Sequence, residues 1–126
     1  LCAADRLDGS GFEKWCAQLF VLLGFSSVEM TKASGDQGVD IVATKDDVRY
    51  AIQCKCYSSD IGNHSVQEVH AGKSMYACHV GVVVTNRYFT SGAKELAKVT
   101  GVLLWDRNKL KSIIQEIQNK NRPGEA

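Results

Sequence analysis

Apolar residues recur along this chain with two spacings, one typical of helices and one typical of strands. Between Gly11 and Gly24 they follow an i, i+3, i+4, i+7 course, which predicts a helix with one buried face and a glycine stop. The same kind of spacing predicts a second helix from about 65 to 77, a third that ends at Gly101, and a last one that Asp106 can cap. Helices are therefore expected at both ends of the chain and between its strands.

Shorter apolar segments between these helices have the composition of strands. The run "VGVVVT" is continuous and β-branched, which is typical of a strand buried on both faces, and "VLLW" predicts a second short buried strand. The predicted strands are 26–32, 39–44, 48–57, 80–85 and 102–105. A three-strand meander followed by crossovers predicts an α/β fold with a mixed central sheet and helices on both faces.

A chain of 126 residues is long enough for one domain with a sizeable core. We expect that domain to span 1–119, and we expect the polar segment 120–126, which holds the lone Pro123, to be a disordered tail. No stretch approaches the ~20 apolar residues of a membrane span, and no signal peptide is visible. The chain starts at Leu1, as a segment of a longer protein would, so an additional recognition or membrane domain is compatible with the sequence.

Charge and cysteine content narrow the function classes. The net charge of +1 gives no general attraction to polyanions, so a nucleic-acid partner would require a local cluster of basic groups. Five cysteines without framework spacing favour buried thiols in a reducing compartment, for which we expect the cytoplasm. Cys54 and Cys56 share a strand face with Ile52, which favours packing over metal binding. The three histidines have no ligand spacing relative to them, so no zinc site is predicted.

Three polar residues interrupt the hairpin predicted between 39 and 57. Asp40 lies in its first strand, and Gln53 and Lys55 lie in its second, all on one face. The opposite face is predicted as core and consists of Val39, Ile41, Ile52, Cys54 and Cys56. The Asp40 carboxylate, the Gln53 amide oxygen and the backbone carbonyl of Cys54 are hard oxygen donors of the kind that Mg²⁺ prefers. With the Lys55 ammonium beside them, these groups fit metal-assisted hydrolysis of a phosphodiester.

The segment "GDQGVDIVA", followed by "YAIQCKCY", resembles the Mrr-like restriction endonuclease domain of the PD-(D/E)xK nuclease superfamily. The resemblance covers most of the chain. "GFEKWCAQLFVLLGF" is similar to the family's first helix, "GVVVTNRYFTSGAKELA" to its later strand and helix, and "GVLLWDRNKL" to its closing segment. It implies a restriction-endonuclease-like fold of three layers.

The resemblance also implies roles for individual residues. In that family the residue equivalent to Asp40 binds metal, the equivalent of Lys55 assists the attacking water, and an acidic residue on the first helix, here Glu13, completes the site. The superfamily's usual motif has Asp or Glu two residues before the lysine, whereas this chain has Gln53, as Mrr-like members commonly do. Metal binding should then depend more strongly on Asp40 and Glu13.

The function that the resemblance implies is a Mg²⁺-dependent deoxyribonuclease of the type IV restriction kind, with Mn²⁺ as an alternative ion. Its substrate would be double-stranded DNA, it would use no small-molecule cofactor, and a homodimer would cut both strands. Sequence or methylation recognition typically resides in another domain of such proteins, and these 126 residues contain no recognisable one.

Some of the candidate residues have a second interpretation. The run Ser10-Gly11-Phe12-Glu13 also fits a capping box, in which Glu13 would reach back to the Ser10 amide. Asp36 lies in a glycine loop and is interpreted as a turn residue. Gln67 resembles a polar position beside the family's active site, and a solvent-facing glutamine explains it equally well.

Candidates for DNA contacts lie mainly in the second half of the chain. The segment "TNRYFTSGA" is the best candidate for a phosphate-facing loop, since it follows a buried strand and precedes a helix N-terminus. The candidates are Arg87, Lys73, Gln67, Thr85 and Lys94, with Lys45 and Lys98 as further basic residues. Solvated surface groups are the alternative interpretation of each of them.

Three other functions stay open on the sequence alone. A Holliday junction resolvase shares the superfamily's acid–acid–lysine arrangement. A non-catalytic DNA-binding module would retain the same fold, and Gln53 is the feature that keeps this alternative open. A cysteine-based redox or metal-binding protein is a distant third, which thiol titration and metal analysis would test.

Overall fold

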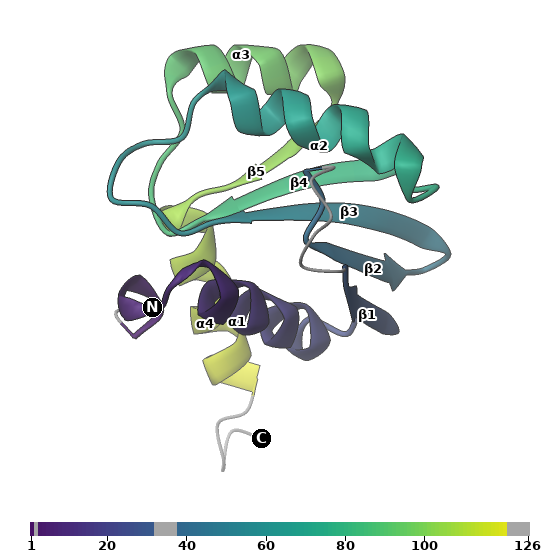
Figure 1. Ribbon diagram of the computed structural model, residues 1–126. Helices are drawn as coiled ribbons and strands as arrows, with labels where there is room; N and C mark the ends of the chain where they lie inside the picture. The colour runs from purple at the N-terminus through teal and green to yellow at the C-terminus, as the bar shows by residue number, and fades with distance from the viewer. Residues whose placement is uncertain (2, 32–37, 121–126) are drawn as a thin grey trace.

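The computed structural model describes residues 1, 3–31 and 38–120, which form a central sheet with helices on both faces (Figure 1). The elements are η1 (Ala4–Arg6), α1 (Gly9–Leu22), β1 (Ser27–Met30), β2 (Ile41–Lys45), β3 (Val48–Lys55), α2 (Asn63–Met75), β4 (Val80–Thr85), α3 (Ser91–Thr100), β5 (Leu103–Trp105) and α4 (Arg107–Lys120). Their order is the predicted one, apart from the short η1 helix, which the sequence does not predict. No helix in the described residues has the length and apolar character that a membrane crossing requires.

Within the described residues the sheet has five strands, in the order β1-β2-β3-β4-β5. β1, β2 and β3 are antiparallel, whereas β3, β4 and β5 are parallel. Parallel strands end on the same side, so the last residues of β3 and β4, Lys55 and Thr85, lie side by side. β2 runs the other way and begins there, with Ile41 opposite Ile52. We call this side of the sheet, where β3, β4 and β5 end, the carboxyl end.

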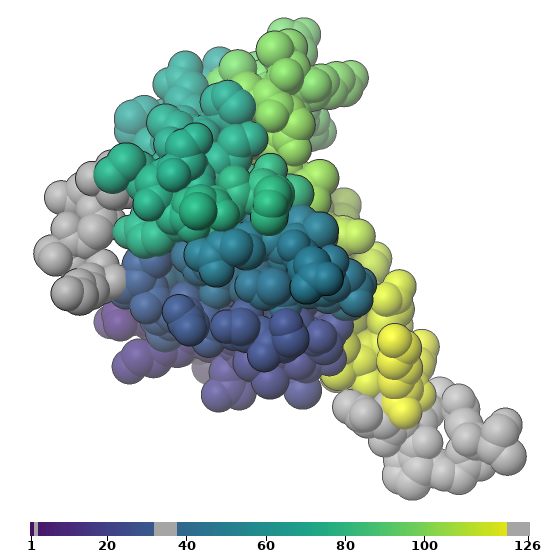
Figure 2. All heavy atoms as spheres, turned by 90° about the vertical axis from the view of Figure 1, so that its right-hand side faces the viewer, coloured from purple at the N-terminus to yellow at the C-terminus, as the bar shows by residue number. Residues whose placement is uncertain are grey.

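The opposite side of the sheet holds the turn between β2 and β3, and we call it the hairpin end. Lys45 pairs with Val48 across a turn formed by Asp46 and Asp47. Both turn residues have positive φ, 52° and 67°, as a tight two-residue hairpin turn requires. Figure 2 shows this side of the molecule, where the blue atoms of the hairpin lie between the teal atoms of α2 and the violet-blue atoms of α1 and β1.

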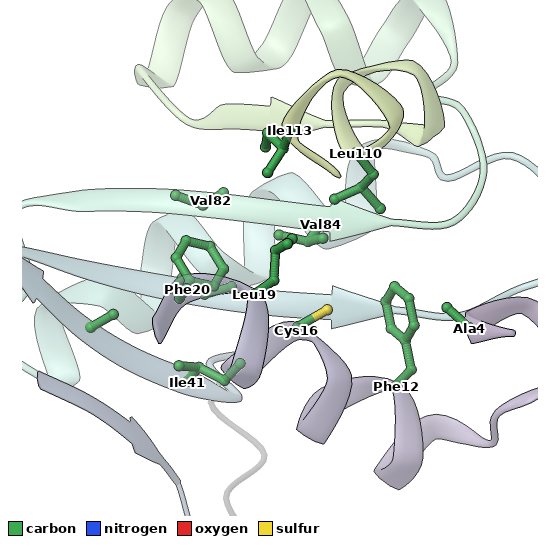
Figure 3. Packing of buried hydrophobic residues seen from close by; sticks show 12 residues of the cluster. Ala4, Phe12, Cys16, Leu19, Phe20, Ile41, Val82, Val84, Leu110 and Ile113 are labelled. Carbon is green, nitrogen blue, oxygen red and sulfur yellow. The ribbon is translucent and has the colours of Figure 1, made fainter. Parts of the chain in front are cut away.

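Two apolar cores hold the layers together, one on each face of the sheet. α1 and α4 cover one face, and α2 and α3 cover the other (Figure 1). β4 contributes to both cores, because Val82 and Val84 pack into the first and Val83 into the second. The predicted burial of this strand on both faces is therefore confirmed. The first core also contains Phe12, Cys16, Phe20, Leu110 and Ile113 (Figure 3).

The first helix begins earlier than the sequence predicts. α1 starts at Gly9, and its N-cap is Asp8, whose Oδ1 accepts a hydrogen bond from the Gly11 N–H at 2.7 Å. Ser10 is therefore a residue within the helix and does not cap it. The capping-box interpretation of Glu13 is wrong for this reason.

Two predictions about burial are also wrong. Val39 packs in the second core with Val42 and Ala51, although the alternation predicts it on the same face as Ile41. Regular pairing begins only at Ile41, so the strand alternation does not extend back to Val39. In β5, Leu103 is 43% exposed, because β5 is the last strand of the sheet and has a neighbour on one side only.

The later helix ends follow the predicted signals. Gly101, with φ of 77°, ends α3, and Asp106 Oδ1 accepts a hydrogen bond from the Lys109 N–H at the start of α4. α4 continues to Lys120, which is the only residue of the predicted tail, 120–126, that lies within the described residues. The domain limits of 1–119 stay a prediction.

Candidate active site

Asp40 lies at the carboxyl end of the sheet, just before β2 begins. Its N–H donates to the Ile52 carbonyl at 2.8 Å, and its Oδ2 accepts a hydrogen bond from the Cys54 N–H at 2.7 Å. The side chain thus occupies the place where a backbone carbonyl would otherwise continue the pairing with β3. This explains why an aspartate, a poor strand former, is found here. The carboxylate is held against β3 at Cys54, close enough to Lys55 for the charge of the lysine to act on it.

Glu13, on the first turns of α1, faces Asp40 from the side of the sheet that α1 covers. The pKa of Glu13 is raised, first by burial, then by the charge of Asp40 and by a hydrogen bond between the two carboxyl groups. The pKa of Asp40 is also raised, mainly by burial, although the Cys54 amide and the Lys55 charge oppose this. Two carboxyl groups in contact share a proton readily or attract a cation. The predicted pairing of Glu13 with the hairpin site is therefore present in the structure.

The NH₂ group of the Gln53 side chain has a hydrogen-bond partner, whereas its amide oxygen has none among the described residues. The side chain is buried, at 3% exposure, and its Nε2 donates to Glu68 Oε1 at 3.3 Å. A carboxylate can only accept, so the NH₂ group must face Glu68 and the amide oxygen must point away from it. Among the described residues, no group donates a hydrogen bond to Gln53 Oε1. A buried acceptor without a donor is costly unless another ligand satisfies it.

Glu68, on α2, is a site residue that the sequence interpretation missed. Its Oε1 accepts the Gln53 hydrogen bond, lies 3.9 Å from Lys55 Nζ, and lies 3.4 Å from Nε2 of His64, one turn earlier on the same helix. The sequence favours Gln67 as the polar position beside the site, but Gln67 is exposed. The buried positions Ser65, Val66, Val69 and Gly72 fix the phase of α2, and this phase could have indicated Glu68.

Gly38 determines how closely α2 approaches the hairpin. Its φ is +71°, a region that favours glycine, and a Cβ at this position would lie 2.8 Å from the backbone carbonyl atoms of Glu68. The chain before Asp40 therefore touches the helix backbone directly. This contact places Glu68 within reach of Gln53 and Lys55.

Lys55 is the last residue of β3, and its ammonium group remains accessible. The side chain is 20% exposed, lies 3.9 Å from Glu68 Oε1, and places Nζ 5.5 Å from the ring centroid of Tyr57. Its backbone is fixed by the neighbouring strand, because Thr85 Oγ1 donates to the Lys55 carbonyl at 2.7 Å. The cation is thus held between a carboxylate and an aromatic ring without a short ion pair that would neutralise it fully.

The cysteines of "QCKCY" pack as the sequence predicts. Cys54 and Cys56 both contact the first core. The pKa of the Cys54 thiol is raised well above its ordinary value, first by a hydrogen bond with the Cys16 thiol and then by burial. Such a thiol is a poor nucleophile and a poor metal ligand at neutral pH. The candidates for chemistry at this end of β3 are therefore the residues on either side of Cys54.

The residues present fit a hard divalent cation. Asp40 and Glu13 supply carboxylate oxygens, and Gln53 Oε1 is an oriented oxygen without a donor. The N–H and C=O of a strand residue point to the same side, so the Cys54 carbonyl is directed where its N–H meets Asp40. In residues 1, 3–31 and 38–120, no three His, Cys, Asp or Glu side chains gather as a metal cluster. The site therefore depends on amide and carbonyl oxygens to complete its donor set.

The candidates for DNA contacts lie at different places. Thr85 is fully buried, and its hydroxyl bonds the Lys55 carbonyl and the Arg87 N–H, so its side chain is not available to DNA. Lys73 lies at the hairpin end, where its carbonyl accepts from the Cys78 N–H just before β4. Arg87 and Lys94 lie at the carboxyl end, after β4 and in the first turn of α3.

Lys45, Lys98 and Asp36 are the remaining residues that the sequence singles out. Lys45 Nζ donates to the Leu23 carbonyl at 3.0 Å and lies at the hairpin end. Lys98 is in the last turn of α3 and is exposed. Asp36 lies outside the described residues. Of the basic candidates, Arg87 and Lys94 thus share the side of the sheet that holds Asp40, Gln53 and Lys55.

Known proteins share both the sequence pattern and the fold. The family described as restriction endonuclease, the Mrr catalytic domain, matches residues 4–114. The crystal structure of AF1548, titled a protein of unknown function, has a TM-score of 0.71 at 19% identity, over 83% of this chain and 64% of its own. No curated protein matches the chain.

Two restriction enzymes have a similar fold over a smaller part of their length. The DNA modification-dependent restriction endonuclease AspBHI has a TM-score of 0.64 at 22% identity, covering 84% of this chain and 30% of its own. The MspJI restriction endonuclease, solved in complex with a 27-mer oligonucleotide, has a TM-score of 0.64 at 20% identity, covering 90% and 29%. This chain therefore spans less than two thirds of each of these three structures.

Proposed function

The chain belongs to the restriction endonuclease family, and from this membership we propose that it is a metal-dependent catalytic domain that hydrolyses phosphodiester bonds of double-stranded DNA. The finer assignment is a type IV restriction enzyme of the Mrr type. The observation that carries the proposal is the buried Gln53 Oε1 without a donor, next to the paired carboxyl groups of Asp40 and Glu13. Without a ligand at this place, the described part of the chain buries an acceptor that no group satisfies and keeps two acids of raised pKa in contact.

The family generally uses divalent metal ions, and we propose Mg²⁺, with Mn²⁺ as a substitute. Asp40, Glu13, Gln53 Oε1 and the Cys54 carbonyl would hold the ion. When bound, such an ion supplies polarisation of the phosphoryl group and a water of lowered pKa. Raised pKa values of the two acids mean that protons compete with the cation, so its binding should strengthen as the pH rises.

Lys55 supplies the positive charge that the site needs beside a metal. In phosphoryl transfer the protein contributes mainly by positioning groups and by stabilising charge on the phosphoryl oxygens. The Lys55 ammonium lies between Glu68 and Tyr57, so its position is restricted before a substrate arrives. We assign it to the orientation of the attacking water and to the charge that develops on the phosphate.

Glu68 acts through its neighbours in this proposal. Its carboxylate turns the Gln53 amide so that the oxygen points away from α2, and it lies close enough to Lys55 to limit the motion of the ammonium. Residues that orient ligands of a metal site typically affect metal affinity or activity by about 10–100-fold. Glu68 is therefore a positioning residue.

The setting of the domain is also part of the proposal. Because the chain spans a minor part of AspBHI and MspJI, DNA sequence or modification would be read by another domain of a longer protein. Cutting both strands would require two copies of the single site, which a homodimer provides. The cytoplasm, where DNA is accessible and thiols stay reduced, is the proposed compartment.

The decisive experiment is plasmid cleavage with Mg²⁺ or Mn²⁺ by the wild type and by the Asp40→Ala and Lys55→Ala variants. Wild type should nick or linearise the plasmid, Asp40→Ala should be inactive, and Lys55→Ala should lose on the order of 10²–10⁴-fold in rate. Glu95→Ala and Lys98→Ala, both at exposed positions of α3, are matched controls for the removed charges and should cut normally.

The same assay separates the alternatives. Cleavage that persists unchanged in both site variants would overturn the assignment of Asp40 and Lys55. A wild type that binds the plasmid but cuts it under no metal condition would be a DNA-binding module. A four-way junction cut in preference to the linear duplex would identify a junction resolvase.

A further inference from the structure

We propose that a polar hollow beside the candidate active site binds a backbone phosphate of the DNA strand, and that Arg87 is its main ligand. The inference rests on the proposed function, because it names a contact of the same substrate. The phosphate would be a neighbour of the one that is cut, and the site would hold the strand in place next to Lys55.

The hollow is built at the carboxyl end of the sheet, by residues that follow β3 and β4 and by the first turn of α4. Its volume is about 610 Å³. Its lining includes Asp5, Tyr57, Ser58, Asn86, Arg87 and Arg107. In open α/β sheets, ligands bind outside the carboxyl ends of parallel strands, which is where this hollow lies.

One wall of the hollow is rigid because its polar groups bond to one another. Arg107 makes two hydrogen bonds to the Asp5 carboxylate, at 2.8 and 2.9 Å, and a third to the Asn86 carbonyl at 3.0 Å. Asn86 is buried, donates to Asp5 at 3.1 Å, and accepts from the Tyr57 N–H at 3.0 Å. Asp5 is thus neutralised by Arg107, and the pKa of its carboxyl is lowered, chiefly by the hydrogen bond with Arg107.

Arg87 contrasts with Arg107 in the same hollow. Its backbone is fixed, because its N–H donates to Thr85 Oγ1 at 3.1 Å and its carbonyl accepts from the Arg107 N–H at 2.9 Å. Its guanidinium has no such partners: in the described residues no group accepts from the buried Nε, and Nη2 lies 3.8 Å from Asp60. The side chain is 41% exposed, so its donors can reach a ligand from solvent.

The charges of the lining favour an anion. Asp5 and Arg107 cancel, which leaves the charge of Arg87 among these three lining groups. The exposed Asp60 carboxylate, 3.8 Å from Nη2 and outside the lining, offsets part of that charge, so a phosphate would compete with Asp60 for the guanidinium. A guanidinium matches the oxygens of a phosphate in a planar, two-point geometry. Tyr57 and Ser58, both exposed, add hydroxyl groups at the rim.

Tyr57 is shared by the hollow and the candidate active site. The centroid of its ring lies 5.5 Å from Lys55 Nζ, and the residue also lines the hollow. A strand with its scissile phosphate at Lys55 would therefore bring an adjacent phosphate towards Arg87. This places two phosphate-binding groups along one path at the carboxyl end.

The test uses the purified chain and a short duplex, with Ca²⁺ in place of Mg²⁺ so that binding is measured without cutting. Arg87→Gln should weaken binding several-fold at low salt and reduce the slope of log K against log[salt] by about 1. Arg87→Lys should keep the slope and lose part of the affinity. Lys98→Gln, the control at an exposed position of α3, should change neither quantity.

A set of duplexes with one neutral methylphosphonate each gives a second readout, which separates the loss of one contact from a general loss of binding by a poorly folded variant. One position, other than the cleaved one, should weaken wild-type binding while adding nothing to the Arg87→Gln loss, because the two changes remove the same contact. Additive losses at every position would overturn the proposal.

Titration with inorganic phosphate distinguishes a site for a DNA backbone phosphate from a site for free phosphate. If phosphate alone binds the wild type tightly, and Arg87→Gln abolishes that binding while DNA affinity is unchanged, the hollow is a site for free phosphate and the proposal is overturned. If the wild type cuts DNA and the Arg87→Gln variant binds DNA as tightly as the wild type, only this inference is overturned. A wild type that neither binds nor cuts DNA defeats the proposed function.

Discussion

The two ends of the sheet differ in how completely their buried polar side chains are hydrogen-bonded. At the hairpin end, Arg49 bonds the carbonyls of Tyr76 and Ala77 through its guanidinium and the Nδ1 of His79 through its backbone N–H. At the carboxyl end, Gln53 Oε1 and Arg87 Nε are buried and have no hydrogen-bond partner in residues 1, 3–31 and 38–120. Within the described residues, both buried side-chain atoms without a partner are at the carboxyl end.

This difference separates groups that hold the fold together from groups that wait for a ligand. A satisfied arginine ties the end of α2 to the start of β3 and gains stability from each bond. An unsatisfied amide, an unpaired guanidinium donor and two acids in contact all cost stability in the free protein. A cluster of strained or unsatisfied groups at one place indicates a functional site there. Substitutions at each end of the sheet test whether groups that stabilise the fold and groups that bind a ligand are separate.

Replacing Arg49 by alanine should have the largest effect on stability. The variant loses two hydrogen bonds from a charged group to backbone carbonyls, so we expect the free energy of unfolding to fall by about 2–3 kcal/mol. Urea unfolding measures this loss. Plasmid cleavage well below the melting temperature should be unchanged, and a loss of cleavage by folded protein would contradict the division between the two ends.

Replacing Glu68 by alanine should affect cleavage more than stability. Without this carboxylate the Gln53 amide is free to turn, and Lys55 loses its acidic neighbour. We expect a roughly tenfold lower cleavage rate, with a weaker apparent affinity for Mg²⁺. Gln67→Ala, the adjacent exposed position, is the control and should behave as the wild type. Equal effects of the two substitutions would remove the case for a positioning role.

Replacing Glu13 by glutamine should stabilise the metal-free protein by about 1 kcal/mol or less, since Glu13 is partly exposed. In the wild type, the folded pKa values of Glu13 and Asp40 are raised above their ordinary values of 4.5 and 3.8. The folded state then holds more protons than the unfolded one, so wild-type stability falls as the pH rises through the window above these values.

The measurement for Glu13→Gln is the free energy of unfolding in EDTA at several pH values. The difference from wild type should be small below pH 4 and should grow towards neutral pH, while cleavage with Mg²⁺ is lost. A variant that is less stable than the wild type at every pH would show that Glu13 stabilises the fold, and would contradict the expectation that this carboxyl group destabilises the metal-free protein.

Much of the fold follows from local patterns in the sequence. The helical spacing before Gly24, the β-branched run of β4 and the caps at Gly101 and Asp106 each depend on neighbours within one or two turns. Asp40, Gln53 and Lys55 were recognisable because the hairpin fixes their spacing, and the structure places them at the same end of the sheet. The prediction that they share one face is not confirmed, because Asp40 meets Glu13 of α1 whereas Gln53 and Lys55 meet Glu68 of α2. Whether they bind metal stays a prediction.

The missed features depend on contacts between distant segments. Both Asp8 and Ser10 are good N-cap residues, and the sequence cannot show which one α1 uses, so the role of Glu13 stayed open. Gln67 and Glu68 differ by one position on α2, which turns the side chain by about 100°. The packing of that helix on the sheet, and not its composition, selects Glu68.

The close approach of Gly38 to α2 has a consequence for how this site can change through mutation. Any side chain at position 38 would displace the backbone of Glu68, which in turn holds Gln53 and Lys55. A substitution there would alter the chemistry of the site although Gly38 carries no functional group. The tolerance of this position is therefore set by the geometry of the candidate site, and variation should be freer in the Asp46–Asp47 turn at the far end of the sheet.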